Sequence, residues 1–128
     1  MKLLLDSHTF VWWIRGDPEL SRLAQSSIEQ SEGGVFVSVA SAWEIAIKVG
    51  LRKWPEATRL LDRFQAGLDA EGFTLLPIDI AHARHAGLLI HPHRDPFDRL
   101  LAAQAMIEDM TILTADPKLA ALGAKTLW

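Results

Sequence analysis

Two short apolar runs near opposite ends of the chain each lead directly into an aspartate. The first run, residues 3–5, is followed by Asp6, and the second, residues 110–115, is followed by Asp116. A short apolar run between polar residues is typical of a strand buried on both faces, as in a parallel sheet. Because ligands bind outside the carboxyl ends of such strands, we expect both aspartates at a functional edge of one sheet.

Strand-like and helix-like segments alternate along the chain, which predicts an α/β fold with a mostly parallel sheet. The predicted strands are residues 2–6, 35–37, 73–76, 111–115 and 124–127. The predicted helices are residues 8–15, 17–31, 40–50, 57–71, 79–90, 97–109 and 117–122. Asp17 and Pro18 are expected to cap and begin the second helix. We therefore expect a single domain over residues 1–128, with about four or five strands flanked by helices.

The bulk properties of the chain exclude several classes of protein. A length of 128 residues fits one domain, and the absence of cysteine excludes disulfides and thiolate chemistry. No signal peptide and no membrane-spanning stretch are visible, so we expect a cytoplasmic protein. The net charge of −3 does not indicate nucleic-acid binding. It does not exclude it either, because acids of a metal site count toward this charge, and the site attracts phosphate only once a metal is bound.

Four acids stand where a strand ends or a helix begins: Asp6, Glu44, Asp98 and Asp116. Carboxylates that lie close together repel one another, and a hard divalent cation with oxygen ligands removes that cost. Taken as a set, they therefore predict a metal site. Each acid also has a local explanation, since Asp6 and Asp116 can cap helices and Glu44 can pair with Lys48.

Several neighbours of these acids could support the site. Ser7 and Thr114 offer hydroxyl groups beside two of the acids, and Asp95, followed by proline, is expected mainly to cap a helix. Arg94, Arg99 and His93 surround the third acid and could contact RNA phosphates, although such residues are often only solvated. His82 and His85 have a spacing that could serve a softer metal, but no cysteine or third nearby histidine supports that hypothesis. The five tryptophans are expected in the core or an interface.

Four segments carry a resemblance to a known family: LLLDSH at residues 3–8, SVASAWEI at 38–45, DPFDRLLAAQA at 95–105 and LTAD at 113–116. Their order and spacing, and the total length, resemble PIN-domain ribonuclease toxins of the VapC type, which belong to type II toxin–antitoxin systems. Each motif alone is weak, and the four together are fairly specific. The resemblance covers essentially the whole chain.

The resemblance implies a parallel sheet with acids at its carboxyl edge and an endoribonuclease that depends on Mg²⁺ or Mn²⁺. It further implies a homodimer and a cognate antitoxin that blocks the site. Carried over by motif, the catalytic acids are Asp6, Glu44, Asp98 and Asp116, with Ser7, Asp95 and Thr114 in support. We expect the three aspartates among the catalytic acids to bind metal, and Glu44 to bind metal or orient the attacking water.

Other functions fit less well. A receiver-type signalling domain needs paired acids after the first strand, and a haloacid dehalogenase-type phosphatase needs Asp-x-Asp there, whereas position 8 is His8. A catalytically silent PIN-fold module that only binds RNA or a protein remains the alternative to the nuclease.

Overall fold

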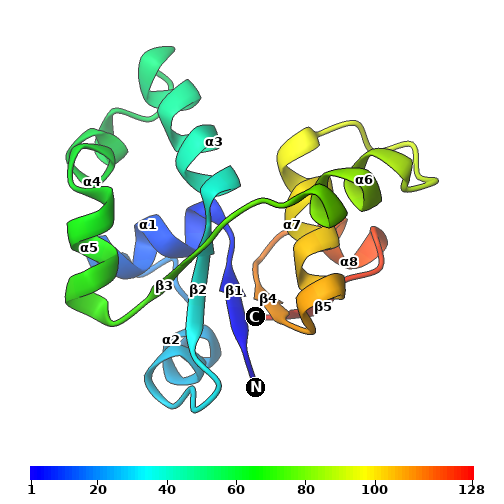
Figure 1. Ribbon diagram of the computed structural model, residues 1–128. Coiled ribbons are helices and arrows are strands. Elements are labelled where there is room, and N and C mark those ends of the chain that lie inside the picture. Colours follow the sequence, from blue (N-terminus) through cyan, green and yellow to red (C-terminus); the bar gives the residue numbers. More distant parts are fainter.

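The computed structural model describes residues 1–128 and contains one five-stranded sheet in the order β3-β2-β1-β4-β5 (Figure 1). The strands are β1 (Leu3–Leu5), β2 (Val35–Ser38), β3 (Thr74–Leu76), β4 (Thr111–Leu113) and β5 (Lys125–Leu127). Every neighbouring pair is parallel. The α/β prediction and the parallel sheet are therefore confirmed.

Eight α-helices and one short 3-10 helix connect these strands. They are α1 (Ser7–Arg15), α2 (Arg22–Glu29), α3 (Val39–Gly50), η1 (Pro55–Ala57), α4 (Thr58–Asp62), α5 (Phe64–Glu71), α6 (Ile80–Leu88), α7 (Pro96–Glu108) and α8 (Pro117–Ala121). In Figure 1, α1, α4 and α5 lie on one side of the sheet, and α6, α7 and α8 lie on the other. Helices on both faces are the usual result of right-handed parallel crossovers.

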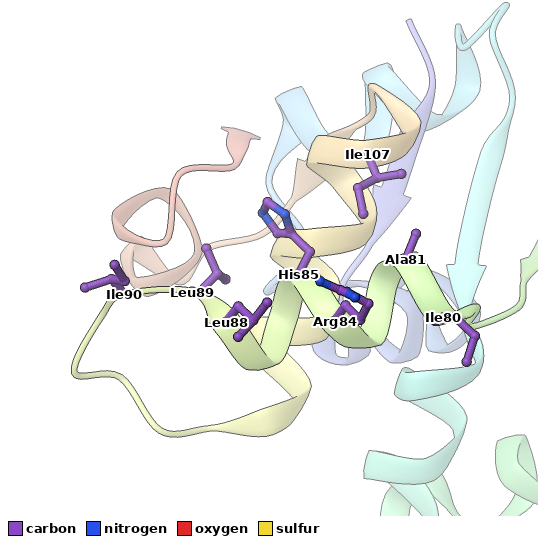
Figure 2. A pocket seen from close by; sticks show the side chains of 8 residues that line it. All are labelled: Ile80, Ala81, Arg84, His85, Leu88, Leu89, Ile90 and Ile107. Carbon is purple, nitrogen blue, oxygen red and sulfur yellow. The ribbon is translucent and has the colours of Figure 1, made fainter.

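The pair of helices α6 and α7 leaves apolar side chains uncovered. Ile80, Leu88 and Ile107 are exposed, and Ile90, just after α6, is fully exposed. They border a shallow hollow of about 780 Å³ that Arg84 and His85 also line (Figure 2). Exposed apolar patches of this kind often mark protein interaction surfaces.

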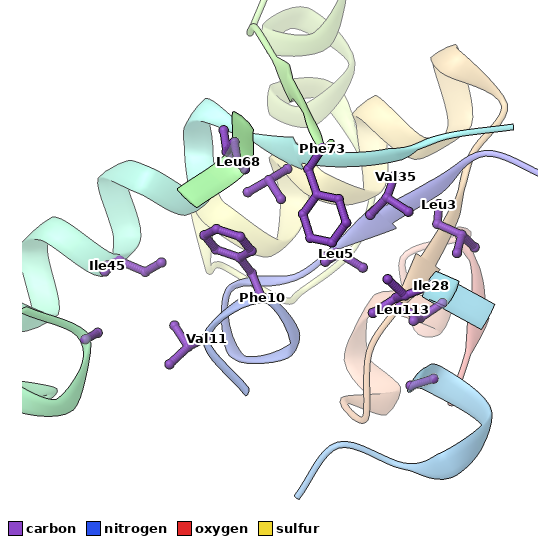
Figure 3. Close-up of a cluster of buried hydrophobic side chains, with 13 residues drawn as sticks. Leu3, Leu5, Phe10, Val11, Ile28, Val35, Ile45, Leu68, Phe73 and Leu113 are labelled. Atoms are coloured by element: carbon purple, nitrogen blue, oxygen red, sulfur yellow. The ribbon is translucent and has the colours of Figure 1, made fainter. Parts of the chain in front are cut away.

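The central strand β1 supplies side chains to two separate cores. Leu3 and Leu5 join a cluster that includes Phe10, Val11 and Phe73, whereas Leu4 packs into a second cluster with residues of α7 and α8 (Figure 3). Because successive side chains of a strand point to opposite faces, three consecutive leucines cover both faces of the sheet. This burial on both sides explains why the strand is continuously apolar.

Two of the predicted helices are wrong in detail. The helix expected from Asp17 starts only at Arg22, because Ser21 caps it, and Asp17 instead accepts a hydrogen bond from Glu19 within a turn. The helix expected over residues 57–71 is broken at Arg63, whose φ of −122° and ψ of 33° are not helical. Local patterns missed both boundaries. No helix is long and apolar enough to cross a membrane.

Candidate active site

Asp6 lies where the central strand β1 ends, beside the end of β4. Its backbone N–H donates to the carbonyl of Leu113 at 3.3 Å, which continues the pairing of the two strands. One carboxylate oxygen, Oδ1, accepts the N–H of Thr9 at 2.8 Å and caps α1. The other, Oδ2, accepts the hydroxyl of Thr114 at 2.5 Å. Asp6 is therefore a helix cap and a member of the strand-end cluster at once.

The hydroxyl of Thr114 joins two of the predicted acids. It donates to Asp6, and it accepts the backbone N–H of Asp116 at 3.0 Å. Asp116 in turn caps α8, because its Oδ1 accepts the N–H of Lys118 at 2.9 Å. This arrangement leaves the second oxygen of Asp116 without a hydrogen-bond donor from the protein. The local capping explanation holds for both aspartates, and it leaves carboxylate oxygens at the sheet edge.

Glu44 reaches the same edge from α3. Its Oε1 accepts the hydroxyl of Ser7 at 2.5 Å, and its Oε2 lies 3.2 Å from the ammonium group of Lys48. The ion pair anticipated as an alternative explanation for Glu44 is thus present. The ion pair with Lys48 does not exclude a role for Glu44 in the site. Ser7, which directly follows Asp6 in the chain, donates to Glu44 and so connects it to the end of β1.

Asp98 stands in the first turn of α7, which Asp95 caps by accepting the N–H groups of Phe97 and Asp98 at 2.9 and 3.4 Å. Its Oδ2 lies 2.7 Å from Nε2 of His93. Burial raises the pKa of Asp98, the hydrogen bond from His93 offsets part of that shift, and the charges of Asp95 and Asp116 raise the pKa further. Burial therefore disfavours the ionised form of Asp98, and the two nearby acids add to that effect.

The helices that carry Glu44 and Asp98 lie side by side. The ring of Trp43 meets the ring of Phe97 edge to face, with centroids 5.0 Å apart, next to the two acids in sequence. The ligand atoms of His93, Asp95 and Asp98 lie within 4.8 Å of one another, but Asp6, Glu44 and Asp116 do not belong to a group this tight. Ser7 and Thr114 thus connect Glu44, Asp6 and Asp116 along one edge, and Asp98 lies near enough to Asp116 for the charge of Asp116 to raise the pKa of Asp98.

Comparison with known proteins assigns this arrangement to a family. The profile of the PIN domain matches residues 3–125. The chain belongs to the PIN domain family. No curated protein matches it in sequence. Among solved structures, VapBC of Salmonella typhimurium bound to DNA is 18% identical with a TM-score of 0.72, and the match covers 99% of this chain and 97% of that one.

Two further structures share the fold of this PIN domain. FitAcB of Neisseria gonorrhoeae is 19% identical with a TM-score of 0.70, covering 98% of this chain and 96% of that one. VapBC2 of Rickettsia felis, bound to a promoter DNA fragment, is 18% identical with a TM-score of 0.67, covering 99% and 98% of the two chains. The TM-scores show a common fold over nearly the whole of each chain.

The predicted RNA-contacting residues of the PIN domain divide into two kinds. Arg94 is exposed, and His93 is half-buried against Asp98. Arg99, in contrast, donates to five backbone carbonyls between Ala86 and His93. Its five N–H groups are all used inside the protein, so we correct our expectation that Arg99 is available to phosphate.

A second cluster of ligand-type side chains lies away from the strand ends. His82 is almost fully buried, and its Nδ1 accepts the N–H of Asp79 while its Nε2 lies 2.9 Å from Glu108. His85, the residue that spacing paired with His82, instead lines the hollow beside α6. Sequence reasoning missed this cluster. A capping signal was available in Asp79, three residues before His82, but nothing local indicated Glu108.

Proposed function

We propose that this PIN domain is a metal-dependent endoribonuclease of the cytoplasm that hydrolyses RNA phosphodiester bonds and is the toxin of a toxin–antitoxin pair. The observation that carries the proposal is the set of acids at the carboxyl edge of the sheet: Asp6, Glu44 and Asp116 are joined through Ser7 and Thr114, and the charge of Asp116 raises the pKa of Asp98. The similarity of the fold to solved toxin–antitoxin complexes supports the biological role.

The donor set fits a hard divalent cation. The four acids with Ser7 and Thr114 offer carboxylate or hydroxyl oxygens. Burial and, to a smaller extent, the charges of Asp95 and Asp116 raise the pKa of Asp98, and a bound cation would favour its ionised form. Mg²⁺ keeps several waters and usually takes only one or two carboxylates directly, so the site does not need all four acids as direct ligands. We assign direct binding of Mg²⁺ or Mn²⁺ to Asp6, Asp98 and Asp116. Either ion, when bound, supplies a more acidic water and neutralises charge on the phosphate.

The remaining residues hold and orient these groups. Ser7 and Lys48 fix the two carboxylate oxygens of Glu44, so that Glu44 can bind the ion or orient the attacking water and accept its proton. Thr114 holds Asp6 in place, and Asp95 holds the start of α7. We assign phosphate contacts to the exposed Arg94 and to His93.

A groove between α1 and the α4–α5 segment supports the antitoxin partner. It has a volume of about 510 Å³ and combines apolar side chains such as Phe10, Ile14 and Phe64 with Arg59 and Arg63. Apolar residues with cationic neighbours fit an amphipathic helix that carries acidic residues on its polar side. Charge reversal at both arginines should weaken neutralisation by a co-expressed cognate antitoxin without changing RNA cleavage by the isolated toxin.

We extend the proposal to a homodimer formed through the exposed apolar face of α6. Ile80, Leu88 and Ile90 are exposed on or just after this helix, so two copies related by a two-fold axis would bury the same apolar face on both subunits. Burial of Leu88 and Ile90 would supply the apolar centre of the interface. Sedimentation of Leu88→Glu should give a monomer if this assignment is right, and an unchanged dimer would contradict it.

The decisive experiment is cleavage of end-labelled RNA by the purified protein with Mg²⁺, with Mn²⁺ and with EDTA. We expect cleavage with either ion and none with EDTA. A catalytically silent binding module would instead retain RNA in a gel-shift assay without producing shorter fragments. Growth arrest on expression, relieved in the Asp6→Asn variant, would connect the activity to the toxin role.

A further inference from the structure

The guanidinium group of Arg99 organises the loop between α6 and α7. Each of its five N–H groups points to a backbone carbonyl. The contacts are Nε to Ala86 at 2.9 Å, Nη1 to His91 at 3.2 Å and His93 at 3.0 Å, and Nη2 to Leu89 at 2.5 Å and Gly87 at 3.5 Å. An arginine with every donor used by main chain is a fixed part of the fold.

The position of Arg99 in its own helix does not explain this arrangement. Arg99 lies in the first turns of α7, where the positive end of the helix dipole disfavours a cation. Its side chain instead reaches the last turn of α6, where the carbonyls of Ala86 and Gly87 lack partners within the helix. The positive charge of Arg99 is thus favourable at the C-terminal end of α6, and the side chain stabilises that helix and not its own.

In the loop between α6 and α7, every second residue presents its carbonyl group to the guanidinium group of Arg99. The carbonyls that face it come from every second residue: Leu89, His91 and His93. These same residues are half-buried, whereas the residues between them are exposed: Ile90, Pro92 and Arg94. Arg99 holds the carbonyls of Leu89, His91 and His93, so a shift of the loop by one residue would turn the exposed residues toward the guanidinium group.

We propose that Arg99 is a positioning residue for the candidate active site. By binding alternate carbonyls, it sets the register of residues 89–94, so that His93 lies against Asp98 and Arg94 projects into solvent where RNA would pass. The part of this inference that concerns RNA rests on the proposed function. The part that concerns the loop stands on the contacts alone.

Lysine cannot substitute for arginine in this role. An ammonium group offers three donors from a single point, whereas the planar guanidinium group spreads five donors over carbonyls on two sides. Arg99→Lys therefore keeps the positive charge but cannot make all five hydrogen bonds to the carbonyls. Arg99→Met loses both the charge and the hydrogen bonds. Arg22→Met is the matched control, because Arg22 is exposed at the start of α2 and makes no hydrogen bond or ion pair through its side chain.

Amide hydrogen exchange tests the loop directly. The N–H groups of Leu89, His91 and His93 are themselves hydrogen-bonded, so their exchange rates report the order of the loop. We expect these amides to exchange at least ~10-fold faster in Arg99→Lys and faster still in Arg99→Met, while the amides of the sheet stay protected. Unchanged exchange in a folded Arg99→Lys variant would overturn the proposal, as would a uniform acceleration throughout the chain. The Lys variant decides the question if the Met variant does not fold.

RNA cleavage kinetics provide the second measurement. A misplaced loop should raise KM for RNA about 10-fold in Arg99→Lys while kcat changes less, whereas a loss of folded protein would lower kcat and leave KM unchanged. Arg22→Met should match the wild type in both constants. If the wild type cleaves no RNA, the proposed function fails, and the exchange experiment still decides the role of Arg99.

Discussion

The His82 cluster on α6 and α7 and the Asp98 cluster at the sheet edge contain the same kinds of side chain. In each, one histidine and two carboxylates place ligand atoms within 4.8 Å of one another. In the first, both nitrogens of His82 have partners, the ring is buried, and the result is a capping box closed by Glu108. In the second, Asp98 faces two other carboxylates, and its pKa is raised by burial and by their charges.

This difference shows that proximity of ligand-type residues is weak evidence for a metal site. A cluster whose donors and acceptors satisfy one another stabilises the fold and has little affinity left for an ion. A cluster with surplus negative charge at the carboxyl ends of parallel strands destabilises the fold unless a cation binds. The four predictions that follow test this contrast.

The largest effect is expected at Asp6. Asn keeps the helix cap through Oδ1, and its amide N–H can donate to the hydroxyl of Thr114, which reverses that bond, but the charge is removed. Asp6→Asn should therefore lower kcat/KM at least ~100-fold, more than 2.7 kcal/mol of transition-state stabilisation, about what one essential polar group supplies. Its free energy of unfolding should change by less than about 0.5 kcal/mol. Asp6→Ala should lose activity equally and, in addition, about 1 kcal/mol of stability through the lost cap. Full cleavage by Asp6→Asn would remove Asp6 from the site.

His82 should show the opposite behaviour. His82→Ala leaves Asp79 and Glu108 without their shared partner and opens a small cavity, so we expect a loss of about 2–4 kcal/mol in urea unfolding. Cleavage per folded molecule should stay at the wild-type rate. His85→Ala, on the exposed side of the same helix, is the control and should lose less than about 0.5 kcal/mol. A metal-dependent loss of activity in His82→Ala would erase the distinction between the two clusters.

Removal of the carboxylate charge at Asp98 and at Glu108 should change Tm in opposite directions. Because the native pKa of Asp98 lies above its ordinary value, the unfolded chain ionises first as pH rises, and the native state loses stability between the unfolded and the native pKa. In EDTA at pH 7, Asp98→Asn should therefore raise Tm, and the difference from the wild type should disappear in acid below both pKa values. Glu108→Gln should lower Tm, because it weakens the bond to His82. A lower Tm in Asp98→Asn would show that its bond to His93 outweighs the repulsion.

The smallest effect is expected at Asp109, directly after Glu108. Its hydrogen bond and ion pair with Lys125 lower the pKa of Asp109, so this contribution to stability is present above the unfolded pKa and is lost as pH falls through the native pKa. Both side chains are largely exposed, and Asp109→Asn should shift Tm by little more than the error of the scan. Asp109→Ala should shift it further, because φ of 54° suits Asp or Asn better than Ala. Equal shifts in the two variants would contradict this separation of charge from backbone conformation.

Local sequence patterns located most of the fold and the acids of the candidate site. Local patterns predicted five strands near their observed places, and three of them are short, mainly apolar runs that end at or before a polar residue, at residues 3–5, 35–37 and 111–115. They failed at Asp17 and Arg63, where a turn and a break interrupt segments of helical composition. They also misjudged Arg99, because the backbone carbonyls that bind it leave no trace in residue identity.

The sequence by itself determined which residues could be buried, where strands end, and that acids follow two of them. Those properties depend on residue type and on neighbours within a few positions. Only the tertiary structure decided that Ser7 holds Glu44, that Thr114 joins Asp6 to Asp116, and that His82 pairs with Glu108. Most of these contacts join residues far apart in the chain, and their partners are selected by the packing of helices on the parallel sheet, which no local pattern encodes.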